Sequence, residues 1–313
     1  MTSSRRGWSE SRIHHWLLEN HRPAGLASSF GHDAATLARN LKRPVLCIDQ
    51  CIEGVHFEPK TAARLAGRKA ADRALSDLAA SAATPRALLM SASYSPRTEE
   101  RWIRASIRAV ADRAREFGAE LVGGDLACAE GPCRISVAAI GELEIAGRPP
   151  ARDQLRAGDV LMVTGALGGS RLGRHLRLVP RLAEGRWLWR NGARAMTDLS
   201  DGLARDVSRL AQRSGVAIEI DSLPIHRDAR RASRASGRSA LEHALYDGED
   251  HELVVALAAS RASALLVLAA RESMPLHAIG RARQGSGVRV PRAEGSLELV
   301  SVDLSRSWTH GRT

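Results

Sequence analysis

Short apolar runs alternate along this chain with longer segments that carry hydrophobic residues at helical spacing. Residues 44–49 and 159–164 are typical of buried strands, whereas Ile103, Ile107 and Val110 recur with the 3.6-residue period of a helix. Strands interleaved with helices predict an α+β chain built from mixed layers rather than an all-helical or all-β one. With 313 residues and 44% hydrophobic content the chain can bury a large core, and two domains are expected.

The boundary between these domains is expected just before the middle of the chain. Residues 147–152 read Gly-Arg-Pro-Pro-Ala-Arg, and Pro and Gly together interrupt any regular element. The prediction is an N-terminal domain over residues 1–148 and a C-terminal domain over residues 149–313.

Composition and charge exclude several classes of protein. There is no run of 18 apolar residues, and the polar N-terminus lacks the apolar stretch of a secretory signal, which predicts a cytoplasmic protein without membrane contact. Four cysteines are too few for a disulfide scaffold, and buried free thiols are expected. The net charge of +11 comes almost entirely from arginines spread along helices, and aromatic residues make up only 4%, so nucleic acid is not the expected partner.

Acidic residues occur in six short, separated contexts, most of them where an apolar run ends or a helix begins. Asp49 is expected at the end of the strand 44–49, Asp125 after a strand over 119–122, and Ser200-Asp201 as the N-cap of a helix. The contexts are Gly31-His32-Asp33, Cys47-Ile48-Asp49, Leu75-Ser76-Asp77-Leu78, Gly123-Gly124-Asp125, Asp198-Leu199-Ser200-Asp201-Gly202 and Gly248-Glu249-Asp250.

Two interpretations of these carboxylates stay open from the residues alone. An Asp beside a Gly is typical of a turn or a helix cap, which needs no ligand. Several carboxylates together, without a competing Cys/His cluster, also suit Mg²⁺, which is held by a few carboxylates, waters and substrate phosphates. No P-loop and no G-x-S-x-G elbow occurs, and the Gly165–Gly173 turn is only a loose dinucleotide fingerprint.

Taken in order, the motifs resemble those of the thiamine-monophosphate kinase family over about residues 10 to 310. Each motif is weak by itself, whereas the ordered set is specific. The blocks are Gly31-His32-Asp33-Ala34-Ala35, Asp49-Gln50-Cys51-Ile52-Glu53-Gly54-Val55-His56-Phe57, Leu75-Ser76-Asp77-Leu78-Ala79-Ala80, Gly123-Gly124-Asp125, Val163-Thr164-Gly165, Asp198-Leu199-Ser200-Asp201-Gly202-Leu203 and Gly248-Glu249-Asp250-His251-Glu252-Leu253.

The resemblance implies a fold and a reaction. The fold would be two α/β domains of the aminoimidazole ribonucleotide synthetase-like type, with the N-terminal domain forming a dimeric sheet or barrel and binding ATP and metal. The reaction would be Mg²⁺-dependent transfer of the γ-phosphoryl group of ATP to thiamine monophosphate, giving thiamine diphosphate in a homodimer. Because the attacking phosphate oxygen is already ionised, no catalytic side chain is expected; metal and positioning carry the transfer.

The resemblance also implies roles for individual residues. It assigns the metal to Asp33, Asp49, Asp77, Asp125, Asp198 and Asp201. It places ATP at Gly124, Asp125, Arg152 and Ser200, and the thiamine phosphate at His56, Glu249 and Trp308. The ring of Trp308 suits stacking on the cationic thiazolium.

The chain departs from the family pattern at several positions next to these acids. The departures are His32, Cys47, Ile48, Ala74 and Leu126. Two alternative functions therefore stay open. One is a divergent relative that acts on another small substrate with ATP, and the other is a non-catalytic protein that keeps the fold.

Overall fold

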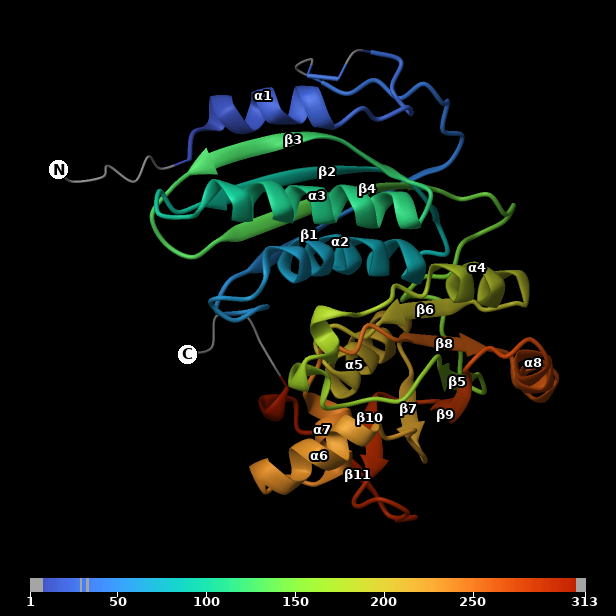
Figure 1. Cartoon of the computed structure of the whole chain (residues 1–313). Helices are drawn as coiled ribbons and strands as arrows, with labels where there is room; N and C mark the ends of the chain where they lie inside the picture. The colour runs from blue at the N-terminus through green and yellow to red at the C-terminus, as the bar shows by residue number, and fades with distance from the viewer. Residues whose placement is uncertain (1–7, 29, 32–33, 308–313) are drawn as a thin grey trace. The chain divides into compact units, whose positions relative to one another are not determined.

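Two compact units make up the computed structural model of this protein, which describes residues 8–28, 30–31 and 34–307 (Figure 1). Unit 1 comprises Met1–Leu78 and Thr84–Glu144, and unit 2 comprises Ala79–Ala83 and Ile145–Thr313. The units thus divide at residues 144/145, where the sequence suggests a junction at residues 148/149.

Unit 1 is built on a four-stranded sheet in the order β1-β4-β2-β3. Strand β4 lies antiparallel to both of its neighbours, whereas β2 and β3 are parallel. Three helices accompany the sheet, and α1 lies along β3 (Figure 1). The elements are α1 (Glu10–Asn20), β1 (Pro44–Ile52), α2 (Ala63–Ala80), β2 (Thr84–Tyr94), α3 (Glu100–Glu116), β3 (Glu120–Cys128) and β4 (Arg134–Glu142).

Helices α2 and α3 cover one face of this sheet. The predicted helical stripe is confirmed, because Ile103, Ile107 and Val110 are all buried in α3. Along β4 the side chains alternate, with Val137 buried on the helix side and Ala138 half-buried on the other, as the pleat requires. We call that second side the open face of unit 1.

Two strands of unit 1 are longer than the sequence suggests. Asp49 lies inside β1 rather than at its end, and β3 continues through Gly123 and Gly124 to Cys128. Pairing is the reason: β1 is in register with β4 from Pro44 to Ile52, and β3 follows β2 to its last residue. Cross-strand hydrogen bonds therefore override the local tendency of glycine to end a strand.

Unit 2 contains a seven-stranded sheet in the order β11-β10-β7-β9-β5-β8-β6. All neighbouring strands are antiparallel except β7 and β10, which are parallel. The elements are β5 (Val160–Val163), α4 (Leu182–Arg190), β6 (Ala195–Asp198), α5 (Leu203–Ser214), β7 (Ala217–Ile220), α6 (Arg227–Ser236), α7 (Ala240–Tyr246), β8 (Leu253–Leu257), α8 (Ala259–Arg271), β9 (His277–Arg283), β10 (Gly287–Pro291) and β11 (Leu299–Ser301).

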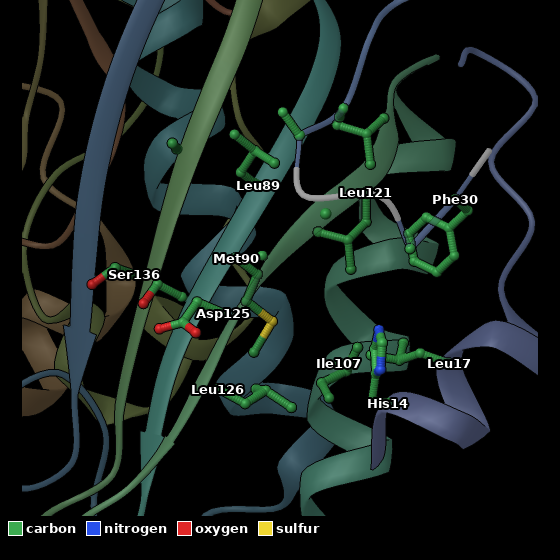
Figure 2. Close-up of a pocket in the computed structure, with 18 of the residues that line it drawn as sticks. His14, Leu17, Phe30, Leu89, Met90, Ile107, Leu121, Asp125, Leu126 and Ser136 are labelled. Atoms are coloured by element: carbon green, nitrogen blue, oxygen red, sulfur yellow. The ribbon is translucent and has the colours of Figure 1, made fainter. Parts of the chain in front are cut away.

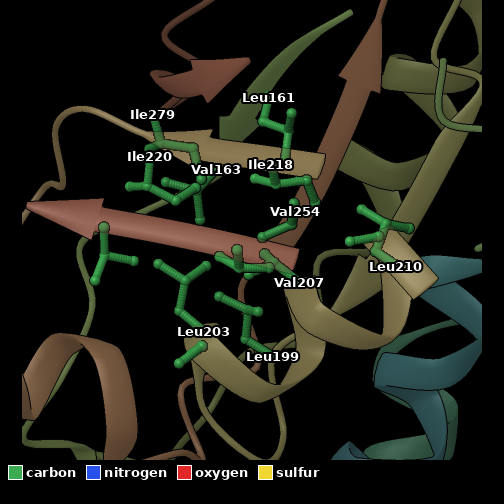
Figure 3. Close-up of a cluster of buried hydrophobic side chains, with 14 of the residues drawn as sticks. Leu161, Val163, Leu199, Leu203, Val207, Leu210, Ile218, Ile220, Val254 and Ile279 are labelled. Atoms are coloured by element: carbon green, nitrogen blue, oxygen red, sulfur yellow. The ribbon is translucent and has the colours of Figure 1, made fainter. Parts of the chain in front are cut away.

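The core of unit 2 forms where α5 packs on the sheet (Figure 3). Leu203, Val207 and Leu210 are fully buried and face strand residues such as Val254 and Ile218. Burial of one such side chain stabilises the fold by about 1.5–3 kcal/mol. This packing fixes the backbone of α5, and with it the positions from which its polar side chains project.

Two further expectations meet the structure at this level. Cys51 and Cys133 are buried free thiols as expected, but Cys128 is exposed at the end of β3, where the sheet has no cover. No helix in the described part of the chain is long and apolar enough to cross a membrane.

Candidate functional site

A cavity of about 620 Å³ opens on unit 1 beside the edge strand β3, and residues of both faces of the sheet line it, Met90 on the helix side and Asp125 on the open face. Its walls are the strands, the helix α1, Ile107 of α3 and a few residues of the chain after α1, and they include Gly124 and Asp125. Figure 2 shows Asp125 beside Ser136 on the sheet, with His14 and Leu17 of α1 on the far side. Most of the lining is apolar, with a few polar side chains on the sheet and on α1, which is typical of a pocket for a small molecule.

Gly124 is required by the close approach of β2. A Cβ atom added at Gly124 would lie 1.9 Å from the carbonyl oxygen of Met90 on the paired strand. The glycine thus has a structural role whether or not a nucleotide lies near it.

Gly124→Ala is expected to lower the free energy of unfolding by about 3 kcal/mol, because backbone rather than a flexible side chain opposes the added methyl group. Urea denaturation measures this, with Gly123→Ala as the matched control. There the nearest atom to the added Cβ is Cδ2 of Leu89, at 3.2 Å, which can move. Equal losses of stability in the two variants would contradict the close-approach explanation.

Asp49 lies on the opposite face of the sheet from Asp125. In the register, Asp49 pairs with Val137, Val137 with Met90, and Met90 with Gly124, so these four share the helix side. Asp125 is the next residue along β3 and points to the open face. Unit 1 therefore does not bring these two predicted ligands together.

Asp49 instead faces helix α2, where its carboxylate accepts a hydrogen bond from Arg73, with Nη2 and Oδ1 3.0 Å apart. Asp77 lies one turn beyond Arg73, on the same side of that helix. Two of the departures from the family pattern also meet here, because the Cys47 thiol donates to the carbonyl of Ala74, 3.2 Å away.

His56 is buried in a turn of unit 1 that follows β1. Its Nδ1 accepts a hydrogen bond from the N–H of Ile52 at 3.0 Å, and its carbonyl accepts one from the buried Lys69 ammonium at 2.5 Å. These contacts fix both the ring and the backbone of His56, so its position does not depend on a ligand.

Unit 2 crowds three carboxylates at the end of β6 and the start of α5. Besides the predicted Asp198 and Asp201, the structure adds Asp206, which is 2% exposed. The expected cap is wrong: the N-cap residue of α5 is Gly202, without a side-chain hydrogen bond. Asp206 accepts from the N–H of Asp201 at 3.0 Å, so the acid inside the helix holds the turn. Its place one turn into an amphipathic helix would have been the only sequence signal.

Burial raises the pKa of Asp206 to about 7, and the charges of Asp198 and Asp201 add to the rise. A carboxyl whose pKa is higher in the folded than in the unfolded chain stabilises the fold least when it is ionised. The stability of unit 2 should therefore fall as the pH rises from about 4 to about 7.

Asp206→Asn is expected to remove this fall. Each pKa unit corresponds to about 1.4 kcal/mol, so the variant should gain of the order of 2–4 kcal/mol over the parent at pH 8 and little at pH 4. Urea unfolding at both pH values without divalent cations is the measurement. Asp221→Asn, at an exposed position, serves as control. If the free energy of unfolding of Asp206→Asn changes with pH as in the parent, the buried Asp206 carboxyl is not the cause of the pH dependence.

The segment 247–252 of unit 2 holds Glu249 in a tight, strained loop. Glu249 and His251 have φ of +60° and +50°, values that cost a non-glycine residue about 1–3 kcal/mol each. Their N–H groups donate to the carbonyls of Ser200 and Leu199, both at 2.8 Å. The strain is thus sustained by hydrogen bonds to the turn that carries Ser200.

The buried Asp250 anchors the other side of this loop. It accepts hydrogen bonds from the N–H of Gly168 and from Arg174 Nη2, the latter at 2.8 Å. Burial raises the pKa of Asp250 to about 6, and the Arg174 charge opposes that rise. The glycine-rich turn 165–170 therefore serves as a partner of the acidic loop rather than as a dinucleotide cradle.

The remaining predicted residues divide between exposed and undescribed positions. Arg152 is exposed in unit 2, and its Nε donates to Thr197 Oγ1 at 2.9 Å. Asp33 and Trp308 lie outside the residues that the structure describes.

The carboxylates at the end of β6 are chemically suited to bind a divalent cation. Asp198 and Asp201 are hard oxygen donors; burial is the main cause of the raised pKa of Asp206, and their negative charges add to it. Across residues 8–28, 30–31 and 34–307, however, no three acidic, His or Cys side chains converge to hold a metal by themselves. Substrate phosphates and water would have to complete the coordination of Mg²⁺.

Both halves of the chain match profiles of one protein family. The N-terminal domain of AIR synthase related proteins matches residues 31–143, and the C-terminal domain matches residues 164–291. The chain is similar to a thiamine-monophosphate kinase of Rhodopirellula baltica, at 34% identity over 87% of this chain and 84% of that protein. A second relative of that name, from Aquifex aeolicus, is 31% identical over 83% and 88%.

Solved structures give the same picture. A thiamine-monophosphate kinase from Stenotrophomonas maltophilia is 34% identical, covers 91% of this chain and 96% of its own, and has a TM-score of 0.75. The AaThiL structure complexed with AMPPCP and TMP is 29% identical over 83% and 87%, with a TM-score of 0.71. The hydrogenase maturation protein HypE of E. coli, at 24% identity and a TM-score of 0.76, shares the fold.

Proposed function

This chain belongs to the thiamine-monophosphate kinase family, and we propose that it transfers the γ-phosphoryl group of ATP to thiamine monophosphate, giving thiamine diphosphate. The observation that carries this function is the 34% identity to a kinase of that name over 87% of the chain. The relative solved with AMPPCP and TMP, which covers 83% of the chain, supports the same pair of substrates.

The residues of this chain supply positioning and charge rather than a base. Both substrates are polyanions, so the barrier is mainly charge repulsion and alignment. In unit 1 we assign the nucleotide to Gly124 and Asp125 at the cavity. We assign metal separately to Asp125 on the open face and to Asp49 and Asp77 on the helix side. This assignment rests on the resemblance of the motifs. We therefore propose that unit 1, and with it the segment 1–148, contributes to the nucleotide site together with residues of unit 2.

In unit 2 we assign Asp198 and Asp201 to metal, and Ser200 and Arg152 to ATP. Mg²⁺, when bound, would neutralise phosphate charge that the protein otherwise meets with arginines alone. Asp206 and the 247–252 loop fix the backbone of this acidic turn, so its donors need no rearrangement on binding.

The direct test is purified protein with ATP, Mg²⁺ and thiamine monophosphate, scored by chromatography for thiamine diphosphate. Product that requires all three components, and that disappears with excess EDTA, is the expected result. ATP turnover that ignores thiamine monophosphate would favour the divergent relative, and failure to bind Mg–ATP would favour a non-catalytic protein.

We also propose a homodimer, formed through unit 1 in the cytoplasm. The edge strand β1 exposes Leu46 and Ile48, at 71% and 69%, toward the open face. Neighbouring apolar side chains of this size on an unpaired edge are typical of a surface that another chain covers.

Replacing both Leu46 and Ile48 with Asp should shift the protein from dimer to monomer, because each subunit would bring two charges into the shared apolar surface. Sedimentation velocity at micromolar concentration measures the shift. Leu297→Asp, at a residue 99% exposed in unit 2, is the control and should stay dimeric. A monomeric parent protein would refute the proposal.

A further inference from the structure

A second cavity, of about 740 Å³, opens on the surface of unit 2 away from its core. Two segments line it, the chain at 151–153 and the last turns of α5, and three of the side chains are arginines. The lining residues are Ala151, Arg152, Asp153, Arg209, Gln212 and Arg213. We call this cavity the arginine basin.

The two walls of the arginine basin are tied together. Ser214, at the end of α5, donates through Oγ to the carbonyl of Arg152 at 2.8 Å and accepts from the N–H of Leu155 at 3.1 Å. Arg152 is in turn held to β6 through Thr197. Because α5 is packed into the core and these hydrogen bonds tie the chain near Arg152 to its end, the backbones of the two walls lie at a fixed spacing.

The basin has more positive charge than its surroundings neutralise. Its one carboxylate, Asp153, is paired with Arg148 at 3.0 Å. Within the described ranges, Arg213 forms no ion pair, and the guanidinium of Arg152 bonds only to the neutral Thr197 hydroxyl through Nε. Two guanidinium groups therefore line the cavity, and no acid among the described residues forms an ion pair with either of them.

Arg209 completes the basin with a pre-oriented side chain. Its Nη1 is held by Asp201 at 2.6 Å and by Asp206 at 3.1 Å. Both contacts use one nitrogen, so neither of them occupies Nη2 or Nε. Guanidinium donors held in this way bind phosphate oxygens in pairs.

We propose that the arginine basin binds a phosphate group of one of the substrates, with Arg209 and Arg213 as binding residues besides Arg152. The inference rests on the proposed function for the identity of the ligands, and on the cavity and its unbalanced charge for the site. The shared chemistry is a phosphate dianion. It comes either from the polyphosphate chain of the nucleotide or from thiamine monophosphate.

A purely structural role for Arg213 makes a different prediction. A cation in the last turn of a helix stabilises it through the helix dipole. Arg271 is a matched control, since it is also exposed, closes the helix α8, and has no ion pair within the described ranges. If only the dipole mattered, both arginines would affect the melting temperature and neither would affect phosphate binding.

The experiment is isothermal titration of full-length protein with AMPPCP plus Mg²⁺ in one arm and with thiamine monophosphate in the other. Arg209→Ala and Arg213→Ala should each weaken one of the two ligands at least tenfold, and the affected arm identifies the source of the phosphate. Arg271→Ala should match the parent in both arms. Melting temperatures confirm that the variants are folded.

Parent-like affinities in both arms for both basin variants would overturn the inference while leaving the kinase assignment intact. The opposite outcome is also distinguishable. If the basin variants bind AMPPCP more weakly than the parent, but the parent itself forms no thiamine diphosphate, the phosphate site is supported and the proposed reaction is refuted.

Discussion

Asn in place of Asp49 or Asp77 is expected to abolish thiamine diphosphate formation while the protein still unfolds cooperatively. Loss of one pre-oriented charged group at a phosphoryl-transfer site typically lowers kcat about 100-fold or more. Asn is chosen because its carbonyl oxygen can still accept the hydrogen bond that Arg73 donates to Asp49. Truncation to Ala would leave the mostly buried Arg73 charge without that acceptor and would confuse stability with catalysis.

Steady-state rates at saturating ATP, together with urea unfolding curves, distinguish the two effects. Asp112→Asn is the matched control, because Asp112 is an exposed helix acid that forms an ion pair with Arg115 on the same helix. It should keep the activity of the parent. Near-normal turnover in both Asp49→Asn and Asp77→Asn would refute their assignment to metal.

Glu249→Gln and Trp308→Ala are expected to raise the KM for thiamine monophosphate by roughly five- to thirtyfold, with little change in the KM for ATP. A carboxylate and an aromatic ring both attract the cationic thiamine rings. The Glu249 side chain starts from a backbone held rigidly against Ser200, so the charge change should act locally. His56, fixed by Ile52 and Lys69, is assigned to the phosphate of the same substrate.

The readout is the separate KM for each substrate, with Glu298→Gln as a control at an exposed acid. If the affinity for ATP falls instead, or neither variant responds to thiamine monophosphate, the acceptor assignment is wrong. A divergent relative that acts on another small substrate with ATP would then be the better interpretation.

The sequence alone was sufficient for features that depend on neighbours along the chain. The stripe of Ile103, Ile107 and Val110 predicts α3 because helical periodicity is a local property. The ordered acidic motifs predict the family for a similar reason, since each motif is a contiguous block of residues. The alternation of strands and helices likewise predicts the mixed layers of both units.

Strand pairing, by contrast, had to be seen in the fold. Asp49 and Asp125 look alike in sequence, each following an apolar run, yet the register of four strands places them on opposite faces of the sheet. A shift of one residue in any pairing would move the side chains of that strand to the other face of the sheet, and no local signal specifies the register.

Charges that meet only after packing were also beyond the sequence. Asp206 and Arg209 looked like ordinary positions of an amphipathic helix. The burial of α5 against the sheet brings them to Asp201 and sets Arg209 and Arg213 opposite Arg152. The sequence determined which chemical groups this protein has and in what order; the tertiary structure decided which of them meet, because burial and strand register depend on residues far apart in the chain.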